Sequence, residues 1–181
     1  FLLPLIYFTI KLNFKKLTTL YLIFFLICFQ GFLGWYMVSS GLVDRIDVSH
    51  YRLSIHLLMA FIILYLIYWN YLKLKNLNIS REINNYLTFF FVFLIFFQIV
   101  IGAFVSGMDA GQIYNSWPLM GNNYFPDDNE VKNLFNINAF NDPSLVQFIH
   151  RNLAYLILFV YLIILFQVYY NKLNNSKVSI N

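Results

Sequence analysis

The chain has 181 residues, of which 60% are hydrophobic and only 11% are charged, whereas soluble domains usually carry about 25% charged residues. This composition predicts an integral membrane protein, and the modest net charge of +4, without a basic cluster interleaved with aromatic residues, argues against nucleic-acid binding. The single cysteine, Cys28, excludes an internal disulfide and a cysteine-based metal site within the chain.

Five apolar segments follow one another along the sequence. Residues 1–10 are too few to cross a bilayer, which takes about 20 residues, so we expect the end of a helix that begins outside this sequence. Residues 17–40, 53–72, 86–106 and 144–170 are each long enough for a complete span. The predicted fold class is therefore an all-α transmembrane helix bundle, with four full spans and an N-terminal helix stub.

The first and third spans share a short polar pattern. Gln30 and Gly34 in the first span recur as Gln98 and Gly102 in the third, with the same spacing. Small residues let helices approach closely, and a buried amide needs a partner on a neighbouring helix. The repeated spacing fits an internal repeat, and these residues fit a simple helix-packing face at least as well as a contact to a ligand.

Helix-start signals precede the second and fourth spans. Ser49 is a good N-cap residue, and Asp142 followed by Pro143 is a cap with proline at the first helical position. Between the third and fourth spans lies a long polar loop, residues 107–142. We expect its glycine-containing first half to be ordered and folded over the membrane, and its Asn-rich second half to be variable.

The basic residues predict the orientation of the spans. Eight of the twelve fall on one side of the predicted membrane, namely Lys11, Lys15, Lys16, Lys73, Lys75, Arg81, Lys172 and Lys177. By the positive-inside rule this side is cytoplasmic, so the 107–142 loop is predicted to lie outside. We expect a multi-pass protein of the bacterial inner membrane.

Two histidines lie at matched positions in the second and fourth spans. His56 is about seven residues past Ser49, and His150 is seven residues past Pro143. At 1.5 Å per residue each histidine sits roughly 10 Å below the outer end of its helix. Both helices run from outside to inside, so the two imidazoles are expected at the same depth.

An imidazole in an apolar helix needs a partner, which is a metal, a haem iron or a hydrogen-bonding side chain. Histidine is the usual axial ligand of b-type haem, and arginine near the water boundary pairs well with propionates. Arg52 lies one turn before His56 on the same helix face, and Arg151 is next to His150. These four residues form the predicted cofactor site, whereas zinc lacks a third ligand of the usual type.

Three stretches of the sequence resemble the haem A synthase family, in its alphaproteobacterial and mitochondrial branch. They are QGFLGWYMVSSGLVDRIDVSHYRLSIHLLMAF, GAFVSGMDAGQIYNSWPLMG and LVQFIHRNLAY, and they occur in the family's order between residues 30 and 155. The resemblance implies eight helices in two pseudo-symmetric four-helix halves. Residues 1–78 would then be the end of the N-terminal half, and residues 79–181 the start of the C-terminal half.

The resemblance also implies roles for the two histidines as haem-iron axial ligands. His56 matches the helix-four ligand of the substrate haem, and His150 matches the helix-six ligand of a haem b. The partner histidines and the catalytic acidic residue would lie in segments outside this sequence, and Gln147 stands where the first half has the acid. The two arginines are expected to anchor propionates, with residues 102–120 closing the outer face.

The implied activity is that of an oxidoreductase in haem biosynthesis. It oxidises the C8 methyl group of haem O to a formyl group, which gives haem A for cytochrome c oxidase. The expected partners are an electron donor, haem O synthase, membrane lipid and a further copy of the chain. Two alternatives are a membrane b-type cytochrome that only carries electrons, and a non-haem transporter or assembly factor whose histidines are merely hydrogen-bonded.

Overall fold

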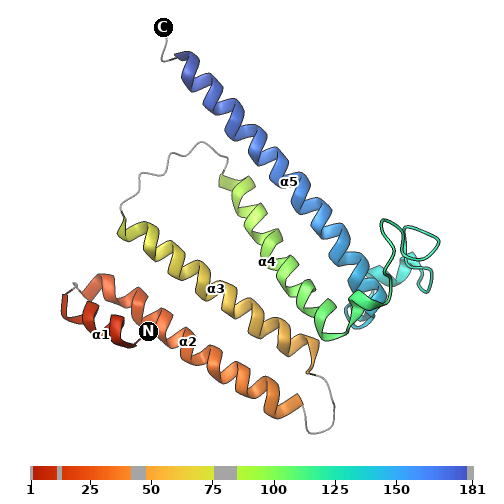
Figure 1. The fold of residues 1–181 in the computed structure, drawn as a ribbon, viewed down its shortest axis with the longest axis horizontal. Coiled ribbons are helices and arrows are strands. Elements are labelled where there is room, and N and C mark those ends of the chain that lie inside the picture. The colour runs from red at the N-terminus through yellow and green to blue at the C-terminus, as the bar shows by residue number, and fades with distance from the viewer. Residues whose placement is uncertain (1, 12–13, 42–47, 76–84, 179–181) are drawn as a thin grey trace. The chain divides into compact units, whose positions relative to one another are not determined.

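A computed structural model of the chain describes residues 2–11, 14–41, 48–75 and 85–178. All regular structure in these residues is helical, without a β-strand, which confirms the predicted all-α fold class. The α-helices, in the order shown in Figure 1, are α1 (Leu2–Lys11), α2 (Phe14–Gly41), α3 (His50–Leu74), α4 (Asn85–Gly107) and α5 (Pro143–Val178).

Prolines and apolar runs explain where these helices form. Pro4 lies in the first turn of α1 and Pro143 at the first position of α5, where the missing N–H has no helical partner to lose. The other two prolines, Pro118 and Pro126, lie in the loop between α4 and α5. The interiors of the long helices therefore contain no proline, and each continues as far as its run of helix-compatible residues.

Four helices contain segments long and apolar enough to cross a membrane: Thr18–Ser39, His50–Leu74, Tyr86–Gly107 and Pro143–Asn171. They confirm the four predicted spans. Even in the best-covered segment, in α4, only 22% of the most apolar window is buried, so most apolar side chains point outward, as in a helix that faces lipid or further helices. The chain is a multi-pass membrane protein.

Three helices extend past the limits expected from hydropathy. Helix α2 begins at Phe14 rather than residue 17, α3 begins at His50 rather than residue 53, and α5 continues to Val178 rather than ending near residue 170. In each case polar residues lie in the part of the helix beyond the apolar run. Hydropathy reports the length of the span, whereas the helix ends where its backbone pairing ends.

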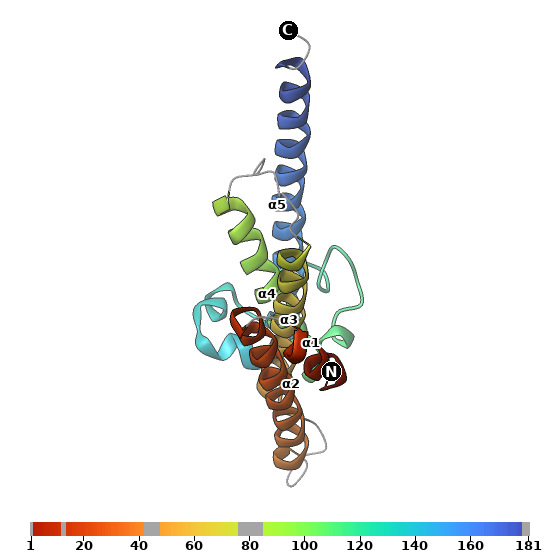
Figure 2. The same cartoon turned by 90° about the vertical axis from the view of Figure 1, so that its left-hand side faces the viewer.

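The chain divides into two compact units, Phe1–Asn78 and Ile79–Asn181. In the first unit α2 and α3 pack side by side, and α1 folds back along the beginning of α2 (Figures 1 and 2). Leu5 of α1 and Ile23 of α2 are buried, and the hydroxyls of Thr9 and Tyr21 are 3.1 Å apart. The first unit is thus a helical hairpin with a short helix against one of its arms.

The second unit is a hairpin of α4 and α5 with the long loop at its connected end (Figure 1). Its core is apolar, with Leu94, Ile101, Phe104, Val146, Leu153 and Val160 all buried. At the start of α5, Asp142 Oδ1 accepts a 3.0 Å hydrogen bond from the backbone N–H of Leu145, which confirms the predicted cap. Ser49 is also the N-cap residue of α3, but its side chain makes no capping bond.

The loop contains three short 3-10 helices, η1 (Ala110–Gln112), η2 (Val131–Phe135) and η3 (Ile137–Asn141). The first of these turns lies in the first half of the loop and the other two lie in the Asn-rich second half, whose expected variability stays a prediction. Gly121 has a φ of +88°, a backbone conformation that glycine adopts without steric cost. This turn belongs to the first half of the loop, where the sequence places its glycines.

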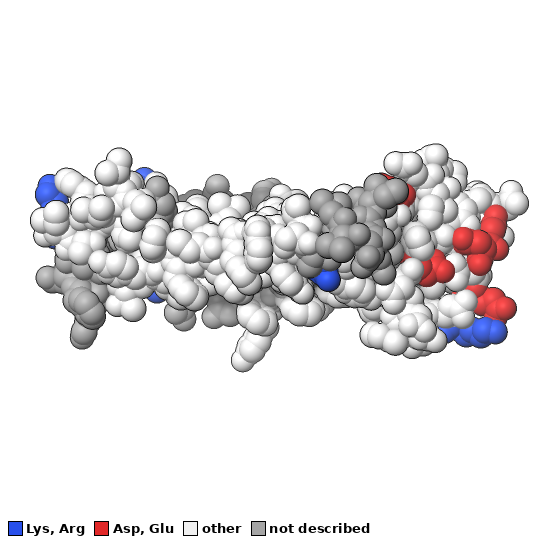
Figure 3. Space-filling model, turned by 90° about the horizontal axis from the view of Figure 1, so that it is seen from below, with Lys and Arg blue, Asp and Glu red and all other residues white. Residues whose placement is uncertain are grey.

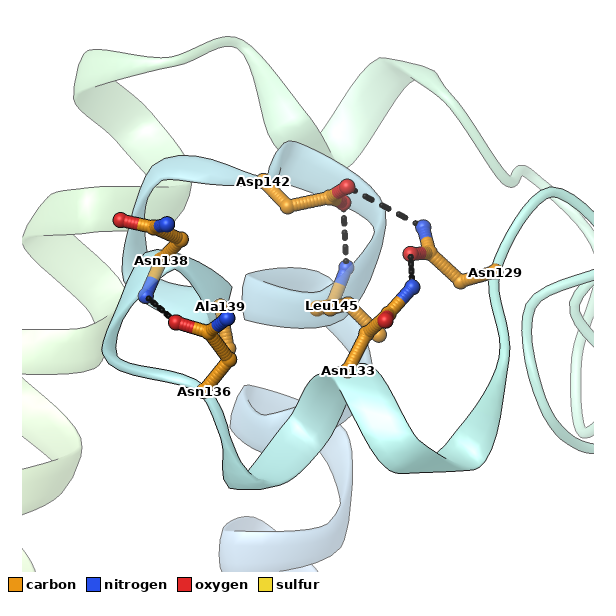
Figure 4. Close-up of a pocket in the computed structure, with 7 residues that line it drawn as sticks. All are labelled: Asn129, Asn133, Asn136, Asn138, Ala139, Asp142 and Leu145. Atoms are coloured by element: carbon orange, nitrogen blue, oxygen red, sulfur yellow. Dashed lines mark hydrogen bonds between the residues drawn. The ribbon is translucent and has the colours of Figure 1, made fainter.

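A polar hollow of about 180 Å³ separates the loop's second half from the start of α5 (Figure 4). Its lining is Asn129, Asn133, Asn136, Asn138, Ala139, Asp142 and Leu145. Asn129 donates to Asp142 Oδ2 at 3.2 Å, and Asn133 donates to Asn129 at 3.3 Å. These amides therefore bind one another and the cap of α5, which ties the second half of the loop to that helix.

The acidic side chains of the described residues all belong to the loop and its junction with α5. They are Asp109, Asp127, Asp128, Glu130 and Asp142. The space-filling view shows acidic groups gathered in one region of the face, together with a basic group (Figure 3). This concentration of charge in the loop agrees with a water-exposed loop between membrane-embedded helices.

Candidate functional site

His56 lies in the second turn of α3, half-buried, with its ring against α2. The side-chain amide nitrogen of Gln30 donates to the carbonyl oxygen of His56 at 2.9 Å and lies 3.2 Å from His56 Nε2. One turn further along α2 is Gly34, where an added Cβ would stand 3.1 Å from Cε1 of the ring. The absence of a side chain at this position lets the imidazole lie directly against the backbone of α2.

The second unit repeats this arrangement with α4 and α5. The amide nitrogen of Gln98 donates to the carbonyl oxygen of His150 at 3.2 Å and lies 3.3 Å from His150 Nε2. Gly102 follows one turn later, and a Cβ there would be 3.2 Å from Cε1 of His150. The same three residue types therefore meet through the same atoms in both units.

This repetition resolves the two interpretations of the Gln–Gly pattern in the sequence. Each glutamine binds the histidine of the neighbouring helix, and each glycine makes room for that histidine's ring. The pattern is thus more than a packing face, and it supports an internal repeat. The sequence pointed to the glutamines and the histidines separately and did not pair them.

Both sites leave polar atoms without partners. Within the described residues, Nδ1 of His56, Nδ1 of His150 and Oε1 of each glutamine are buried and make no hydrogen bond. Buried polar atoms are rarely unpaired in native proteins, and those that lack a partner often belong to sites that bind an ion or take part in redox chemistry. The two imidazoles therefore fit a role as ligands of a further group.

The donor set favours a haem over a bare metal ion. Among the described residues no three His, Cys, Asp or Glu side chains come together in a way that could hold an ion. A single imidazole from one helix is what a haem iron takes on each side of its plane, whereas a structural zinc ion takes four ligands.

Arg52 and His56 share the face of α3 that is turned toward α2, as their spacing predicted. The guanidinium of Arg52 lies over the ring of Tyr36 in α2, 5.2 Å from its centroid, which is within range of a cation–π interaction. The stacked position places a positive charge one turn from the histidine. Pairing of Arg52 with a propionate stays a prediction.

Arg151 holds the loop. Its guanidinium donates to the carbonyl oxygens of Tyr114 at 2.7 Å, Ser116 at 3.0 Å and Leu119 at 3.4 Å. Three of its five N–H donors are thus engaged by the first half of the loop. Only the remaining donors could meet a propionate in this arrangement, and that role stays a prediction.

Gln147, one turn before Arg151, binds the same part of the loop. It is 5% exposed, and its amide nitrogen donates to the carbonyl oxygen of Tyr114 at 3.0 Å. Further along α5, Tyr155 accepts a 2.7 Å hydrogen bond from the indole of Trp117. The face of α5 that carries these residues therefore holds residues 114–119 against the part of the helix that contains His150.

Two adjacent carboxylates of the loop, Asp127 and Asp128, also accept hydrogen bonds. Burial alone would raise the pKa of Asp128, but the hydrogen bonds donated by Ser144 at 2.6 Å and Tyr114 at 2.9 Å outweigh it and hold this pKa below its usual value. The backbone N–H of Asn122, followed by the amide of Asn123, lowers the pKa of Asp127. Burial, and then the bond to Asp128, raises the pKa of Tyr114.

The resemblance to known proteins covers almost the whole chain. Residues 1–180 match the family model COX15-CtaA, described as cytochrome oxidase assembly protein. The chain belongs to this family. No solved structure matches the chain significantly.

Three relatives illustrate the similarity, and each is named heme A synthase. The chain is 50% identical to the protein of Pelagibacter ubique over 97% of its own length and 53% of the relative's. It is 42% identical to that of Rickettsia bellii, over 96% and 55%, and 42% identical to that of Ehrlichia canis, over 88% and 48%. This family member therefore spans about half the length of the curated relatives it matches.

Proposed function

We propose that the chain is the part of a haem A synthase that supplies one histidine to each of two haem sites. The whole protein then oxidises the C8 methyl group of haem O to a formyl group and yields haem A for cytochrome c oxidase. The observation that carries this proposal is the 50% identity, over 97% of the chain, to a protein named heme A synthase. The duplicated glutamine–histidine arrangement supports two such sites.

The two histidines would hold different haems. His56 would be an axial ligand of the substrate, haem O, and His150 an axial ligand of a resident haem b that relays electrons. The buried, unpartnered ring nitrogens support both roles. A haem iron supplies the redox chemistry that protein side chains lack. The second axial ligands and the catalytic acid would come from helices outside this sequence.

In this proposal the chain's own residues orient the two imidazoles, bind the haem propionates and shield the haem site from water. The glutamines and glycines fix each imidazole against the neighbouring helix. Arg52 would be available for a propionate because, among the described residues, its guanidinium lies over an aromatic ring and not against a carboxylate. Arg151 would bind a propionate with the donors that the loop leaves over, and the loop that it holds would keep water from the outer end of the haem site.

The same proposal predicts the membrane, the orientation and the partners of the protein. The distribution of basic residues supports an inner-membrane protein with residues 107–142 on the outer side. The two compact units, each with one glutamine–histidine contact, support the interpretation of residues 1–78 and 79–181 as parts of two related halves. An electron donor, haem O synthase and a second copy of the chain are the partners we expect.

Haem A formation is the test of this function. Residues 1–181 would replace the matching half of the Pelagibacter ubique relative, and the chimera would be expressed in a host without haem A synthase. We expect extracted haems to include haem A. A chimera that enters the membrane and binds haem without forming haem A would instead indicate an electron-carrying cytochrome, and one without a Soret band would indicate a non-haem protein.

A further inference from the structure

The backbone determines how each glutamine amide is oriented. The amide nitrogen of Gln30 faces the carbonyl oxygen of His56, and that of Gln98 faces the carbonyl oxygen of His150. A carbonyl oxygen only accepts hydrogen bonds, so a flipped amide would place two acceptors against each other. In both units it is therefore the amide nitrogen, with its two hydrogens, that also meets the histidine ring.

This orientation determines which ring nitrogen carries the proton. An amide nitrogen donates and does not accept, so Nε2 of the histidine, at 3.2 Å in the first unit and 3.3 Å in the second, must accept. A neutral imidazole has one protonated and one accepting nitrogen. The proton therefore lies on Nδ1, which is buried without a partner in the described residues, as is Oε1 of each glutamine.

Binding of iron by a neutral imidazole is incompatible with this contact, whichever nitrogen binds. If Nε2 binds, its lone pair is no longer available to the amide. If Nδ1 binds, the proton must move to Nε2, where it meets the amide's own hydrogens. The bond between the amide and the histidine carbonyl survives in both cases, because it does not involve the ring.

We propose that Gln30 and Gln98 are positioning residues that lock the two histidines in a single tautomer before haem binds and release the ring when it does. The lock is a property of the haem-free chain, whereas its release by haem rests on the proposed function. The carbonyl bond keeps each glutamine beside its ring throughout. A typical net hydrogen-bond contribution implies that loss of the lock speeds haem binding about 2- to 10-fold.

The lock is tested directly in the haem-free chain. Residues 1–181 in lipid nanodiscs, with ¹⁵N-labelled histidine, give ring-nitrogen shifts that distinguish the two tautomers. We expect the Nδ1–H form at His56 and His150, with Gln30→Leu changing only the first and Gln98→Leu only the second. An Nε2–H form in the unsubstituted chain, or ring-nitrogen shifts that stay the same in both glutamine variants, would overturn the proposal.

The release is tested by the rate of the Soret change when haem is added to the haem-free chimera described above. We expect Gln98→Leu to bind haem faster than the parent and Gln98→Glu more slowly, because an ionised glutamate stabilises a proton on Nε2. Gln167→Leu, farther along α5, is the matched control and is expected to bind at the parent's rate. Slower binding in the leucine variant would show that Gln98 supports the bound state instead, which refutes the release.

The two tests keep the lock separate from the proposed function. If the parent chimera binds no haem, the haem sites of the proposed function fail, while the nitrogen shifts still decide whether the glutamines hold the tautomer. If haem binds and haem A forms but the shifts do not respond to the glutamines, the function stands and the lock is wrong.

Discussion

Arg151 donates a 2.7 Å hydrogen bond to the carbonyl oxygen of Tyr114, which connects the residue next to His150 with the first half of the outer loop. The same guanidinium reaches the carbonyls of Ser116 and Leu119. A planar, five-donor cation serves three diverging carbonyls in a way that an ammonium group does not. The loop is therefore anchored to the same helix turn that carries the second histidine.

Replacement of Arg151 should release this loop. We expect Arg151→Lys to increase the rate of proteolytic cleavage within residues 107–123 several-fold and Arg151→Ala about tenfold or more, since hydrogen bonds to charged groups contribute more than neutral ones. The rate is measured on the chain in nanodiscs. Lys132→Ala removes only an exposed ion pair with Glu130 and should leave cleavage at these sites unchanged; equal sensitivity of both variants would contradict the assignment.

Gly31 and Gly34 of α2 provide a matched pair for the first site. An added Cβ at Gly34 would stand 3.1 Å from the His56 ring, whereas one at Gly31 would meet nothing within 4 Å. Gly31→Ala should stabilise the helix by up to about 1 kcal/mol. Gly34→Ala should stabilise the helix less than Gly31→Ala does, and it should change the ¹⁵N chemical shifts of the His56 ring. Unfolding in detergent and the ¹⁵N spectrum measure the two effects, and an unchanged ring signal would mean that the ring does not lie against Gly34.

A second glycine comparison concerns the loop. Gly121 combines a φ of +88° with Asp127 packed where a Cβ would be, whereas a Cβ at Gly111 would be 3.8 Å from Val105. We expect Gly121→Ala to destabilise the loop by about 1–3 kcal/mol, and Gly111→Ala to have much less effect. Hydrogen exchange of residues 116–128 is the measurement. Similar protection in both variants would argue against a strained turn at Gly121.

Acid should loosen the same loop. The pKa values of Asp127 and Asp128 are lower in the folded loop than in an unfolded chain. Such carboxylates contribute their full stabilisation above the ordinary pKa of about 4, and the contribution is lost as the pH falls through the lower folded values. Trp117 fluorescence, with the other two tryptophans replaced by phenylalanine, should report a transition below about pH 4. Asp128→Asn should weaken the loop at neutral pH and reduce that transition.

The histidines should act separately. In the chimera, His56→Ala should abolish retention of the substrate haem and spare haem b, and His150→Ala should do the reverse, because each ring belongs to a different compact unit. Extracted haems are identified by mass and quantified. Equal loss of both haems from either substitution would exclude two independent sites.

The spans were predictable from the sequence because each is a long, mostly apolar run, and the start of α5 was predictable because Asp142 and Pro143 act locally. The shared face of Arg52 and His56 also followed from helix geometry. These features depend on residues that are close in the chain. They need no knowledge of which helix packs against which.

The contacts across helices were not predictable in the same way. Gln30 and His56 pair because antiparallel packing brings the late part of α2 beside the early part of α3. The hydrogen bonds from Arg151 to the loop carbonyls depend on the path of residues 107–123, which no local sequence pattern specifies. A signal was present in the equal Gln–Gly spacings, but only the packed helices show that it refers to the histidines.

Each glutamine–histidine pair lies within one hairpin of consecutive segments, which has a consequence for biogenesis. A hairpin leaving the translocon already contains a polar partner for its imidazole, so partitioning into lipid does not require prior capture of a porphyrin. On the proposed function, insertion of the haem-free protein and its loading with haem would be separate steps, and a cell short of iron would still accumulate the membrane-embedded, haem-free protein.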